Sequence, residues 1–285
     1  MGIVYLNGEY LSAEQAKISP MDRGFLFGDG IYEVIPAYQG KMLGFAAHLE
    51  RMKNGLQELE ITLDYSQQVW RKICEQLCEK NSGDNLGIYL HVSRGADNKR
   101  AHAYPTNITP TVFAFAFEIP PPPISDIDNA TTYSVSLEQD KRWQRCHIKS
   151  TALLGNVMHY QRGAAAGDQE TILFNRLDEI TEASSSNVFI VKQGVISTPP
   201  LDNQILPGIT RWLILTILHS HSDFKVEQRV ITKNELLNAD EIWITSATKE
   251  VGPVIKVNGK LVGNGQPGKV WQQVQSLFTK HKFDY

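Results

Sequence analysis

The chain has 285 residues, of which 42% are apolar and 21% charged, a composition typical of a soluble globular protein with one large or two ordinary domains. Its net charge of −3 and the lack of any apolar run of about 18 residues indicate neither a nucleic-acid partner nor a membrane. The first residues show no signal-peptide pattern, and the cysteines are too few and too irregularly spaced for disulfides or zinc, so we expect a reducing cytoplasm and no metal: Cys74, Cys78 and Cys146.

The first part of the chain mixes short strands with helices. Apolar alternation predicts strands at residues 3–6, 9–11, 86–94 and 111–118. Helical spacing of apolar residues predicts helices at residues 45–59 and 65–79. The first two strands should form a hairpin, because they flank Asn7-Gly8, and Ser66 should cap the second helix.

Four consecutive prolines at residues 120–123 divide the sequence. Proline has no N–H group to donate to a sheet and favours an extended, semi-rigid connection. We therefore expect an N-terminal domain over residues 1–118, a linker over 119–130 and a C-terminal domain over 131–285. An edge loop within one domain is the alternative.

Strands and helices alternate again after the prolines. Apolar runs predict strands at residues 131–137, 171–174, 188–192 and 241–245. Helical spacing predicts helices at residues 153–166 and 209–220. The sequence contains no internal repeat, and its one low-complexity tract is the run of prolines.

Two residues of the C-terminal part point to a particular chemistry. Lys149 ends a strand-like run, and Glu182 lies on a turn rich in serine. An amine that forms an imine and an acid that keeps a pyridine nitrogen protonated are both needed in pyridoxal phosphate chemistry. Either residue alone is more often a solvated surface charge, so the interpretation depends on the remaining motifs.

Further segments carry groups suited to anions. Residues 206–210 lead from a turn into a helix, whose first N–H groups would be available to phosphate. Residues 245–248 end a strand in small hydroxyl side chains, and His48 and Arg51 lie three apart on a predicted helix. The loop over residues 94–102 is basic and could bind a carboxylate. On spacing alone, an ordinary helix start, a strand end and solvated charges explain these segments at least as well.

Taken together, the motifs resemble the fold-type IV pyridoxal phosphate enzymes, the class IV aminotransferases, and within them most closely the bacterial D-amino-acid transaminases. The resemblance runs from Gly2 to about residue 270, and several motifs in the same order leave little room for chance. The motifs occupy residues 22–34, 89–95, 100–102, 142–150, 181–189 and 205–211.

The resemblance implies a site for pyridoxal 5′-phosphate. Lys149 would be the Schiff-base lysine and would later move the substrate proton, while Glu182 would bind the pyridine nitrogen. Leu206 would pack against the ring, and the serines at 184–186 would shape its surroundings. The phosphate would be surrounded by Arg51, Ile209, Thr210, Ser246 and Ala247. Ala247 departs from the family pattern, which has a hydroxyl residue at this position, so it can offer only its N–H group.

The resemblance also implies which enantiomer is used. D-specific members hold the substrate α-carboxylate with an Arg-x-His pair assisted by a tyrosine, and this chain has Arg100-Ala-His102 together with Tyr32. Holding the carboxylate on one side of the cofactor fixes which hydrogen faces the lysine. The implied reaction is transamination between a D-amino acid such as D-alanine and a 2-oxo acid such as 2-oxoglutarate, giving pyruvate and D-glutamate.

Three alternatives stay open. A branched-chain L-amino-acid aminotransferase would be expected to carry an Arg-Pro-bearing strand in this region, which is missing. An aminodeoxychorismate lyase is a weaker choice. A catalytically silent small-molecule-binding protein on the same fold would have no use for the amine of Lys149.

Fold and assembly follow from the resemblance. It implies a two-domain α/β (α+β) fold, with a small N-terminal α/β domain, a larger C-terminal pseudo-barrel domain that carries the lysine, and the cofactor in the cleft between them. Such enzymes are homodimers, in which the loop with Arg100 and His102 commonly enters the active site of the partner subunit.

Overall fold

The computed structural model describes residues 2–285, which divide into two compact units. The first unit contains the chain up to Pro121 together with Ile148–Leu153, and the second contains Pro122–His147 and Leu154–Tyr285. Each unit combines helices with one sheet, which confirms the expected α/β (α+β) class. The domain boundaries at 118 and 131 stay a prediction, and the observed units differ from them in assigning Ile148–Leu153 to the first unit.

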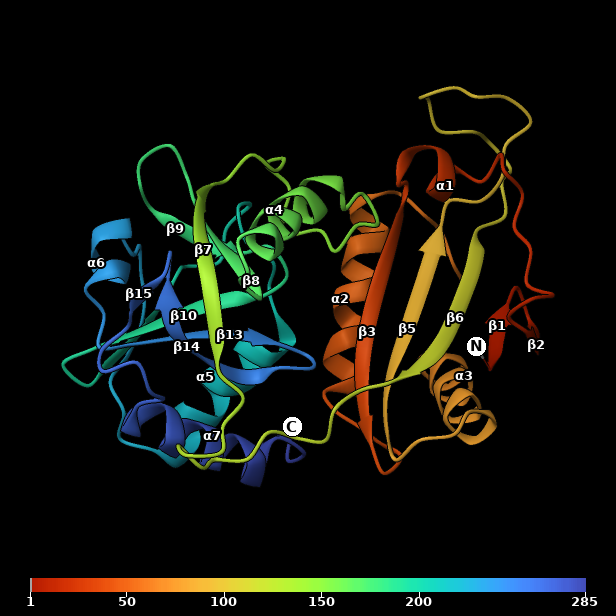
Figure 1. Ribbon diagram of the computed structural model, residues 1–285. Helices are drawn as coiled ribbons and strands as arrows, with labels where there is room; N and C mark the ends of the chain where they lie inside the picture. Colours follow the sequence, from red (N-terminus) through yellow and green to blue (C-terminus); the bar gives the residue numbers. More distant parts are fainter. Residues whose placement is uncertain (1) are drawn as a thin grey trace. The chain divides into compact units, whose positions relative to one another are not determined.

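The sheet of the first unit has six strands in the order β2-β1-β6-β5-β3-β4, and all neighbours are antiparallel (Figure 1). The strands are β1 (Ile3–Leu6), β2 (Glu9–Ser12), β3 (Gly30–Tyr38), β4 (Lys41–Met42), β5 (Asn85–Ser93) and β6 (Thr111–Glu118). The predicted hairpin is confirmed. Asn7 and Gly8 both have positive φ, 48° and 104°, as a tight two-residue hairpin turn requires.

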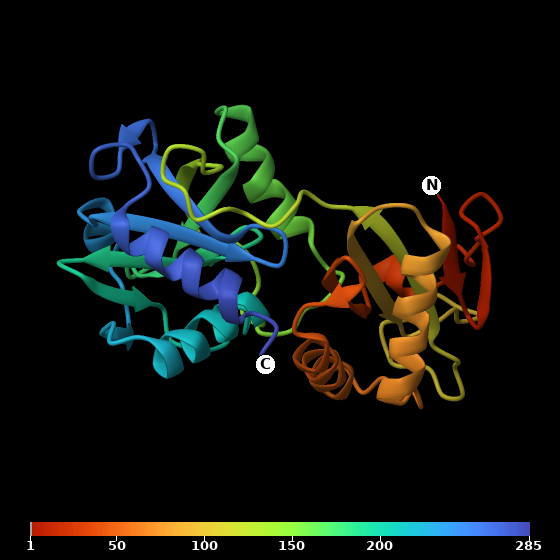
Figure 2. The ribbon, with the colours of Figure 1, turned by 90° about the horizontal axis from the view of Figure 1, so that it is seen from below.

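Helices cover one face of this sheet (Figure 2). They are α2 (Phe45–Glu58) and α3 (Gln67–Lys80), while the short α1 (Arg23–Phe27) precedes β3. Both predicted helices are confirmed, and Ser66 caps α3 by accepting a hydrogen bond from Val69 N. Every second residue of the central strands enters the core that the helices close, as with Ile31, Ile88 and Ala114.

The other face of the same sheet is aromatic. Tyr32, Tyr89 and Phe115 form a row in which the ring centroids are 5.6 and 5.0 Å apart. Phe113 and Phe117 of β6 flank Phe115 on this face. These rings are half-buried or exposed in the chain described, in contrast to the fully buried residues on the helix side.

The sheet of the second unit has nine strands in the order β12-β11-β10-β13-β14-β7-β8-β9, with β15 paired to β14. It curls into a half-barrel, so that β9 meets β10 through the turn at residues 184–186, where Ala183 N donates to Ser186 O (2.7 Å). The strands are β7 (Tyr133–Gln139), β8 (Glu170–Phe174), β9 (Ile180–Ala183), β10 (Asn187–Lys192), β11 (Val195–Thr198), β12 (Val226–Gln228), β13 (Glu241–Ser246), β14 (Glu250–Val257) and β15 (Lys260–Leu261).

Four helices accompany this half-barrel: α4 (Leu154–Ala165), α5 (Ile209–His221), α6 (Lys233–Leu237) and α7 (Lys269–His281). Helices α5 and α7 lie side by side (Figure 2). Trp271 of α7 is buried and donates from Nε1 to Val251 O (2.7 Å), which joins this helix pair to β14. The predicted strands at β7, β8, β10 and β13 and the helices α4 and α5 are confirmed.

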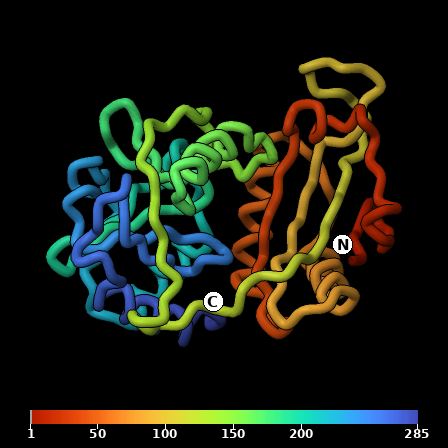
Figure 3. Tube along the Cα trace, in the orientation of Figure 1, coloured from red at the N-terminus to blue at the C-terminus, as the bar shows by residue number. Residues whose placement is uncertain are grey.

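The connection between β5 and β6 is the longest irregular segment of the first unit (Figure 3). It extends past the end of the sheet and carries Arg100 and His102. No helix within residues 2–285 is both long and apolar enough to cross a bilayer.

Candidate active site

The segment that carries Lys149 lies along the beginning of β3. Tyr32 N donates to Lys149 O (3.1 Å), and Thr151 N donates to Gly30 O (2.9 Å). Gly28 permits this approach, because it has a φ of 67° and a Cβ there would lie 2.8 Å from the main chain of Ala152. The main chain at Lys149 is therefore fixed to the first unit, whereas its side chain is half-buried, with Nζ 4.1 Å from the ring centroid of Tyr32.

Arg51 of α2 is paired with a buried carboxylate on the helix side of β3. Its Nε and Nη2 donate to Glu33 Oε1 (2.8 Å) and Oε2 (2.7 Å), and His48 Nδ1 donates to Oε2 (2.7 Å). Burial alone would raise the pKa of Glu33, but Arg51 and His48 outweigh it and hold that pKa at about 2. Burial lowers the pKa of His48, Glu33 opposes that effect, and the charges of Arg51 and Lys149 add to it.

Arg100 and His102 lie beside Phe27 at the end of α1. The guanidinium carbon of Arg100 is 5.1 Å from the centroid of the Phe27 ring, and the His102 ring is 5.5 Å from it. Both residues are in the first unit, as are Tyr32 and Lys149. Neither side chain has a carboxylate partner within the residues that the structure describes, so both could donate hydrogen bonds to a bound anion.

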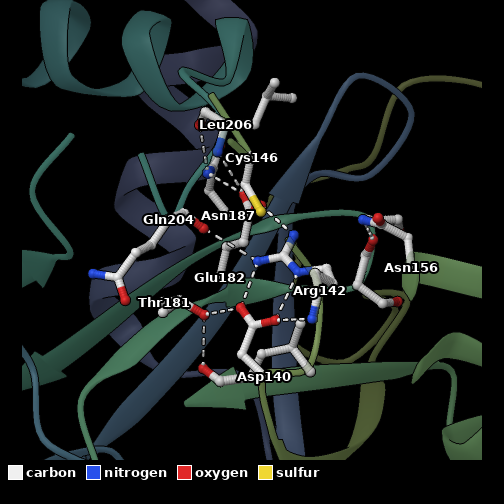
Figure 4. Close-up of polar contacts among 12 residues, drawn as sticks. Asp140, Arg142, Cys146, Asn156, Thr181, Glu182, Asn187, Gln204 and Leu206 are labelled. Carbon is white, nitrogen blue, oxygen red and sulfur yellow. Dashed lines mark hydrogen bonds and ion pairs between the residues drawn. The ribbon is translucent and has the colours of Figure 1, made fainter. Parts of the chain in front are cut away.

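Glu182 is buried at β9 in the second unit and accepts three hydrogen bonds (Figure 4). Arg142 Nη1 donates to Oε1 (2.6 Å), while Asn187 Nδ2 (3.2 Å) and Leu206 N (3.0 Å) donate to Oε2. A carboxylate accepts about four hydrogen bonds, so one position is left for an N–H donor such as a protonated ring nitrogen. Burial raises the pKa of Glu182, and the Arg142 guanidinium opposes that effect.

Arg142 serves two carboxylates at once. Its Nε and Nη2 donate to Asp140 Oδ1 (3.1 Å) and Oδ2 (2.8 Å), and its side chain is only 2% exposed (Figure 4). Asp140 also accepts from Thr181 Oγ1 (3.0 Å). The sequence motifs contain Arg142 and Asn187, but no role was expected for either. Their one signal was a position close to Lys149 and Glu182 in the chain.

Helix α5 begins at an N-terminus without a side-chain cap. Its N-cap is Gly208, and no side chain among residues 2–285 caps the first turn, so the N–H groups of Ile209 and Thr210 are available to an anion. Gly208 is required here, because a Cβ would lie 2.0 Å from Asn187 Oδ1. Asn187 Nδ2 in turn donates to Leu206 O (2.9 Å), which ties this helix start to the surroundings of Glu182.

The end of β13 lies next to the same residues. Thr245 pairs with Asn187 across β10 and β13, and its buried Oγ1 has no hydrogen-bond partner within residues 2–285. Ser246 accepts from Lys249 N (3.3 Å) in the turn that contains Ala247. A buried hydroxyl without a hydrogen-bond partner and a helix N-terminus with available N–H groups both suit the binding of a phosphate. These residues therefore fit the phosphate of the implied cofactor.

The serines that follow Glu182 point elsewhere. Ser184 and Ser185 donate short hydrogen bonds to Glu170, and Ser186 Oγ donates to Glu170 Oε2 (3.2 Å). Glu170 is fully buried, so the three hydroxyls satisfy a carboxylate on β8. The role expected for these serines in shaping the surroundings of the cofactor stays a prediction.

The expected residues are divided between the units. Tyr32, Arg51, Arg100, His102 and Lys149 belong to the first unit, and Glu182, Leu206, Ile209, Thr210, Ser246 and Ala247 belong to the second. Contacts within the first unit join Lys149 to Tyr32, and contacts within the second join Glu182 to Leu206.

A group of possible metal ligands lies apart from these residues. Ligand atoms of His221, His281 and Asp284 lie within 4.8 Å of one another. The two imidazole rings, however, are stacked with centroids 3.7 Å apart and an interplanar angle of 7°. An imidazole binds a metal in its own plane, and nearly parallel planes share no such point, so the observed arrangement does not form a metal site.

Comparisons with known proteins agree with the fold and the motifs. The family model of amino-transferase class IV matches residues 30–257. The chain is 38% identical to D-alanine aminotransferase from Staphylococcus haemolyticus over 98% of its own length and 97% of that protein. It is also 38% identical to D-alanine aminotransferase from Bacillus licheniformis, over 96% and 94% of the two chains.

Solved structures share the architecture at lower identity. Branched-chain amino acid aminotransferase from Escherichia coli superposes with a TM-score of 0.87 at 23% identity, covering 98% of this chain and 93% of that one. The enzyme of the same name from Thermobaculum terrenum, in its PLP form, gives a TM-score of 0.86 at 18% identity, covering 99% and 94%. At this identity the likeness concerns the fold alone. With the family model matched over most of its length, the chain belongs to the class IV aminotransferases.

Proposed function

We propose that the protein is a pyridoxal-phosphate-dependent transaminase that moves an amino group between D-amino acids such as D-alanine and 2-oxo acids such as 2-oxoglutarate, giving pyruvate and D-glutamate. The observation that carries the cofactor assignment is the buried carboxylate of Glu182, held by three donors with one acceptor position left. The near full-length similarity to D-alanine aminotransferases supports the choice of substrate.

Pyridoxal phosphate, when bound, supplies an electrophilic carbon for amines and a ring that draws electrons from the substrate Cα. Lys149 would hold it covalently and Glu182 would accept a hydrogen bond from its ring nitrogen. Leu206, whose N–H donates to Glu182, would pack against the ring. Donors to the phosphate would be Arg51, Ile209, Thr210, Ser246 and the N–H group of Ala247.

Arg51 can take this role without leaving Glu33. A guanidinium has five N–H donors in about one plane, and two of them donate to Glu33. Glu33 thus fixes the plane and orientation of Arg51. A fixed guanidinium loses less side-chain entropy on binding an anion than a mobile one.

Proton transfer would be carried by Lys149 Nζ. The amine lies over the Tyr32 ring, and the main chain on both sides of it is hydrogen-bonded, so motion is confined to the side chain. A four-carbon side chain can move its nitrogen over several ångströms while the backbone stays fixed. Lys149 can therefore take a proton from one carbon and deliver it to another without a change in the fold.

Substrate binding would rest on Arg100, His102 and Tyr32. Arginine binds a carboxylate with two parallel hydrogen bonds, and a charge-assisted bond contributes about 1.5–3 kcal/mol. A carboxylate held by this pair has a fixed direction, so one of the two enantiomers would present its α-hydrogen to Lys149.

The test is a paired assay of D-alanine and L-leucine as amino donors with 2-oxoglutarate as acceptor. We expect clear preference for D-alanine. Preference for L-leucine would replace the proposal with a branched-chain aminotransferase. Borohydride reduction followed by peptide mapping tests the lysine, and label on any residue other than Lys149 would contradict its role.

We further propose a homodimer in a reducing cytoplasm. The aromatic face of the first sheet, with Tyr89, Phe115 and the 37% exposed Phe117, is of the kind that a second chain covers. The three cysteines are free thiols, as expected where disulfides do not form. Light scattering at several concentrations tests the assembly, and a monomer throughout would refute it.

A further inference from the structure

The loop over residues 96–110, called here the carboxylate loop, makes few main-chain hydrogen bonds to the rest of the first unit. Its main-chain hydrogen bonding to the rest of the described chain stops at Asp97, whose N–H donates to Met21 O (3.4 Å). Beyond this point lie Arg100 and His102, the residues proposed to bind substrate. A loop without backbone hydrogen bonds is mobile unless side chains hold it, so the support of this loop must come from elsewhere.

Arg23 provides that support from α1. Its Nη1 donates to Ala101 O (2.6 Å) and Ala103 O (3.4 Å), and its Nη2 donates to His102 O (3.2 Å). Three consecutive carbonyl groups thus turn toward one guanidinium that is 3% exposed. Because these carbonyls lie on both sides of the His102 Cα, they fix the direction in which its side chain leaves the backbone.

The ring of Phe27 adds side-chain contacts to these hydrogen bonds. The guanidinium carbons of Arg23 and Arg100 lie 4.9 and 5.1 Å from its centroid, and the His102 ring lies 5.5 Å from it. Arg23, Arg100 and His102 therefore gather around one aromatic ring. The carboxylate loop lies next to α1 in Figure 1, in agreement with these contacts.

Asp29 orients Arg23 and a second arginine together. Arg23 Nε donates to Asp29 Oδ2 (2.7 Å), and Arg94 donates from Nε to Oδ2 (2.8 Å) and from Nη2 to Oδ1 (3.0 Å). Arg94 in turn stacks on Tyr104, with its guanidinium carbon 3.6 Å from the ring centroid. One carboxylate therefore holds two arginines that grip the loop at residues 101–103 and at Tyr104.

We propose that Arg23, oriented by Asp29, is a positioning residue for the carboxylate-binding pair Arg100 and His102. Its donors are engaged by loop carbonyls and Asp29, so it acts on substrate only through the loop. The inference rests on the proposed function, since it assumes that Arg100 and His102 bind the substrate carboxylate. Loss of Arg23 should therefore weaken recognition of the carboxylate while leaving the amine chemistry at Lys149 intact.

The first experiment measures loop order in the cofactor-free protein, independently of activity. Arg23→Met keeps the length of the side chain and removes its donors. Tryptic cleavage after Lys99 and Arg100 should quicken at least about five-fold, because loss of the anchor raises the population of the open loop. Arg71→Met is the matched control, since Arg71 is a half-exposed arginine of the same unit that does not contact the loop. Equal cleavage rates in both variants would overturn the proposal.

The second experiment compares D-alanine with isopropylamine, in which a methyl group replaces the carboxylate. With the holoenzyme, Arg23→Met should lower kcat/KM for D-alanine about 10-fold, mainly through KM, and change that for isopropylamine less than about two-fold. Equal losses for both amines would show a general structural defect and overturn the proposal.

Tyr104→Leu provides a second variant should Arg23→Met fail to fold, because Tyr104 is 50% exposed and the change removes only the stacking partner of Arg94. It should quicken cleavage of the loop and raise KM for D-alanine, in both cases by less than Arg23→Met, and no change in either would contradict the proposed anchoring of the loop. If the wild-type enzyme prefers L-donors, the proposed function fails, whereas the cleavage rates still decide whether Arg23 holds the loop.

Discussion

Two buried glutamates, one in each unit, are each bound by an arginine, yet their acidities move in opposite directions. Glu33 receives two hydrogen bonds from Arg51 and one from His48, and its pKa falls to about 2. Glu182 receives one hydrogen bond from Arg142, and its pKa is raised by burial. Burial acts on both acids, and Glu182 has in addition a nearby like charge in Asp140, which takes the other side of the Arg142 guanidinium.

A cation that is shared between two acids leaves a buried carboxylate without a full counter-charge. Asp140 acts on Glu182 as a like charge, and Arg142 cannot neutralise both acids. The donors that stabilise the charged form of Glu33 all come from the protein, so we expect this acid to have a structural role. Glu182 has one acceptor position left and would gain most from a further cationic N–H donor, which the ring nitrogen of the proposed cofactor would supply.

The largest effect is expected from Glu33→Ala. This change takes the carboxylate from Arg51, whose side chain is only 10% exposed, and breaking a buried ion pair costs about 3–5 kcal/mol of unfolding free energy. Urea unfolding measures the loss. Glu75→Ala, at a half-exposed ion pair on α3, is the control and should stay within about 0.5 kcal/mol of the wild type. A similar small loss for Glu33→Ala would mean that the pair is not a structural element.

Glu182→Gln should have a large effect on activity and a small one on stability. Loss of one preorganised charge partner costs about 10²–10³-fold in turnover. The unfolding free energy of the cofactor-free protein should change by less than about 1 kcal/mol, because Arg142 keeps Asp140. Steady-state kinetics with D-alanine measure the loss of turnover, and urea unfolding measures the change in unfolding free energy. A stability loss as large as that of Glu33→Ala would erase the contrast between the acids.

The dependence of stability on pH should have opposite signs at the two acids. The folded pKa of Glu33 is about 2 against an ordinary 4.5, so its contribution of about 3 kcal/mol is complete above 4.5 and is lost as pH falls toward 2. The folded pKa of Glu182 is raised, so stability falls as pH rises from 4.5 through that value. Acid unfolding of Glu33→Ala and Glu182→Gln, each against the wild type, should show these signs.

The smallest effect is expected from Asp140→Asn. Removing the like charge gives Arg142 to Glu182 alone, so the pKa of Glu182 should fall toward its ordinary value. Carboxylate infrared difference spectra of the cofactor-free protein measure it, with Asp126→Asn on the surface as control. An unchanged pKa would show that sharing of Arg142 does not explain the behaviour of Glu182.

Much of the fold was predictable because its signals are local. The Asn7-Gly8 turn, the cap at Ser66 and the periodic helices depend on neighbours in the chain. Strands β9 and β11, of four residues each, were not predicted, whereas β1 and β2 of the same length were, because the Asn7-Gly8 turn between those two marks a hairpin. The placement of Ile148–Leu153 in the first unit depends on hydrogen bonds to residues more than 100 positions away, which no local pattern contains.

The site was predictable in its chemistry but not in its supports. Lys149 and Glu182 stand within family motifs, and the roles expected for them stay predictions. Glu33, Arg142 and Arg23 were not expected to act on neighbouring site residues. Their partners lie 18, 40 and about 80 positions away, and only the packing of sheets and loops brings them together.

The assignment of Ile148–Leu153 to the first unit has a consequence for biosynthesis. When the ribosome has released residues up to Pro121, the first unit still lacks the segment that pairs with Gly30 and Tyr32. Chains emerge at about 5–20 residues per second, so this edge of β3 stays unpaired for seconds while the next residues are made. A gene fragment that stops at residue 121 would share this defect permanently, and the earliest viable boundary for an isolated first unit lies beyond Leu153.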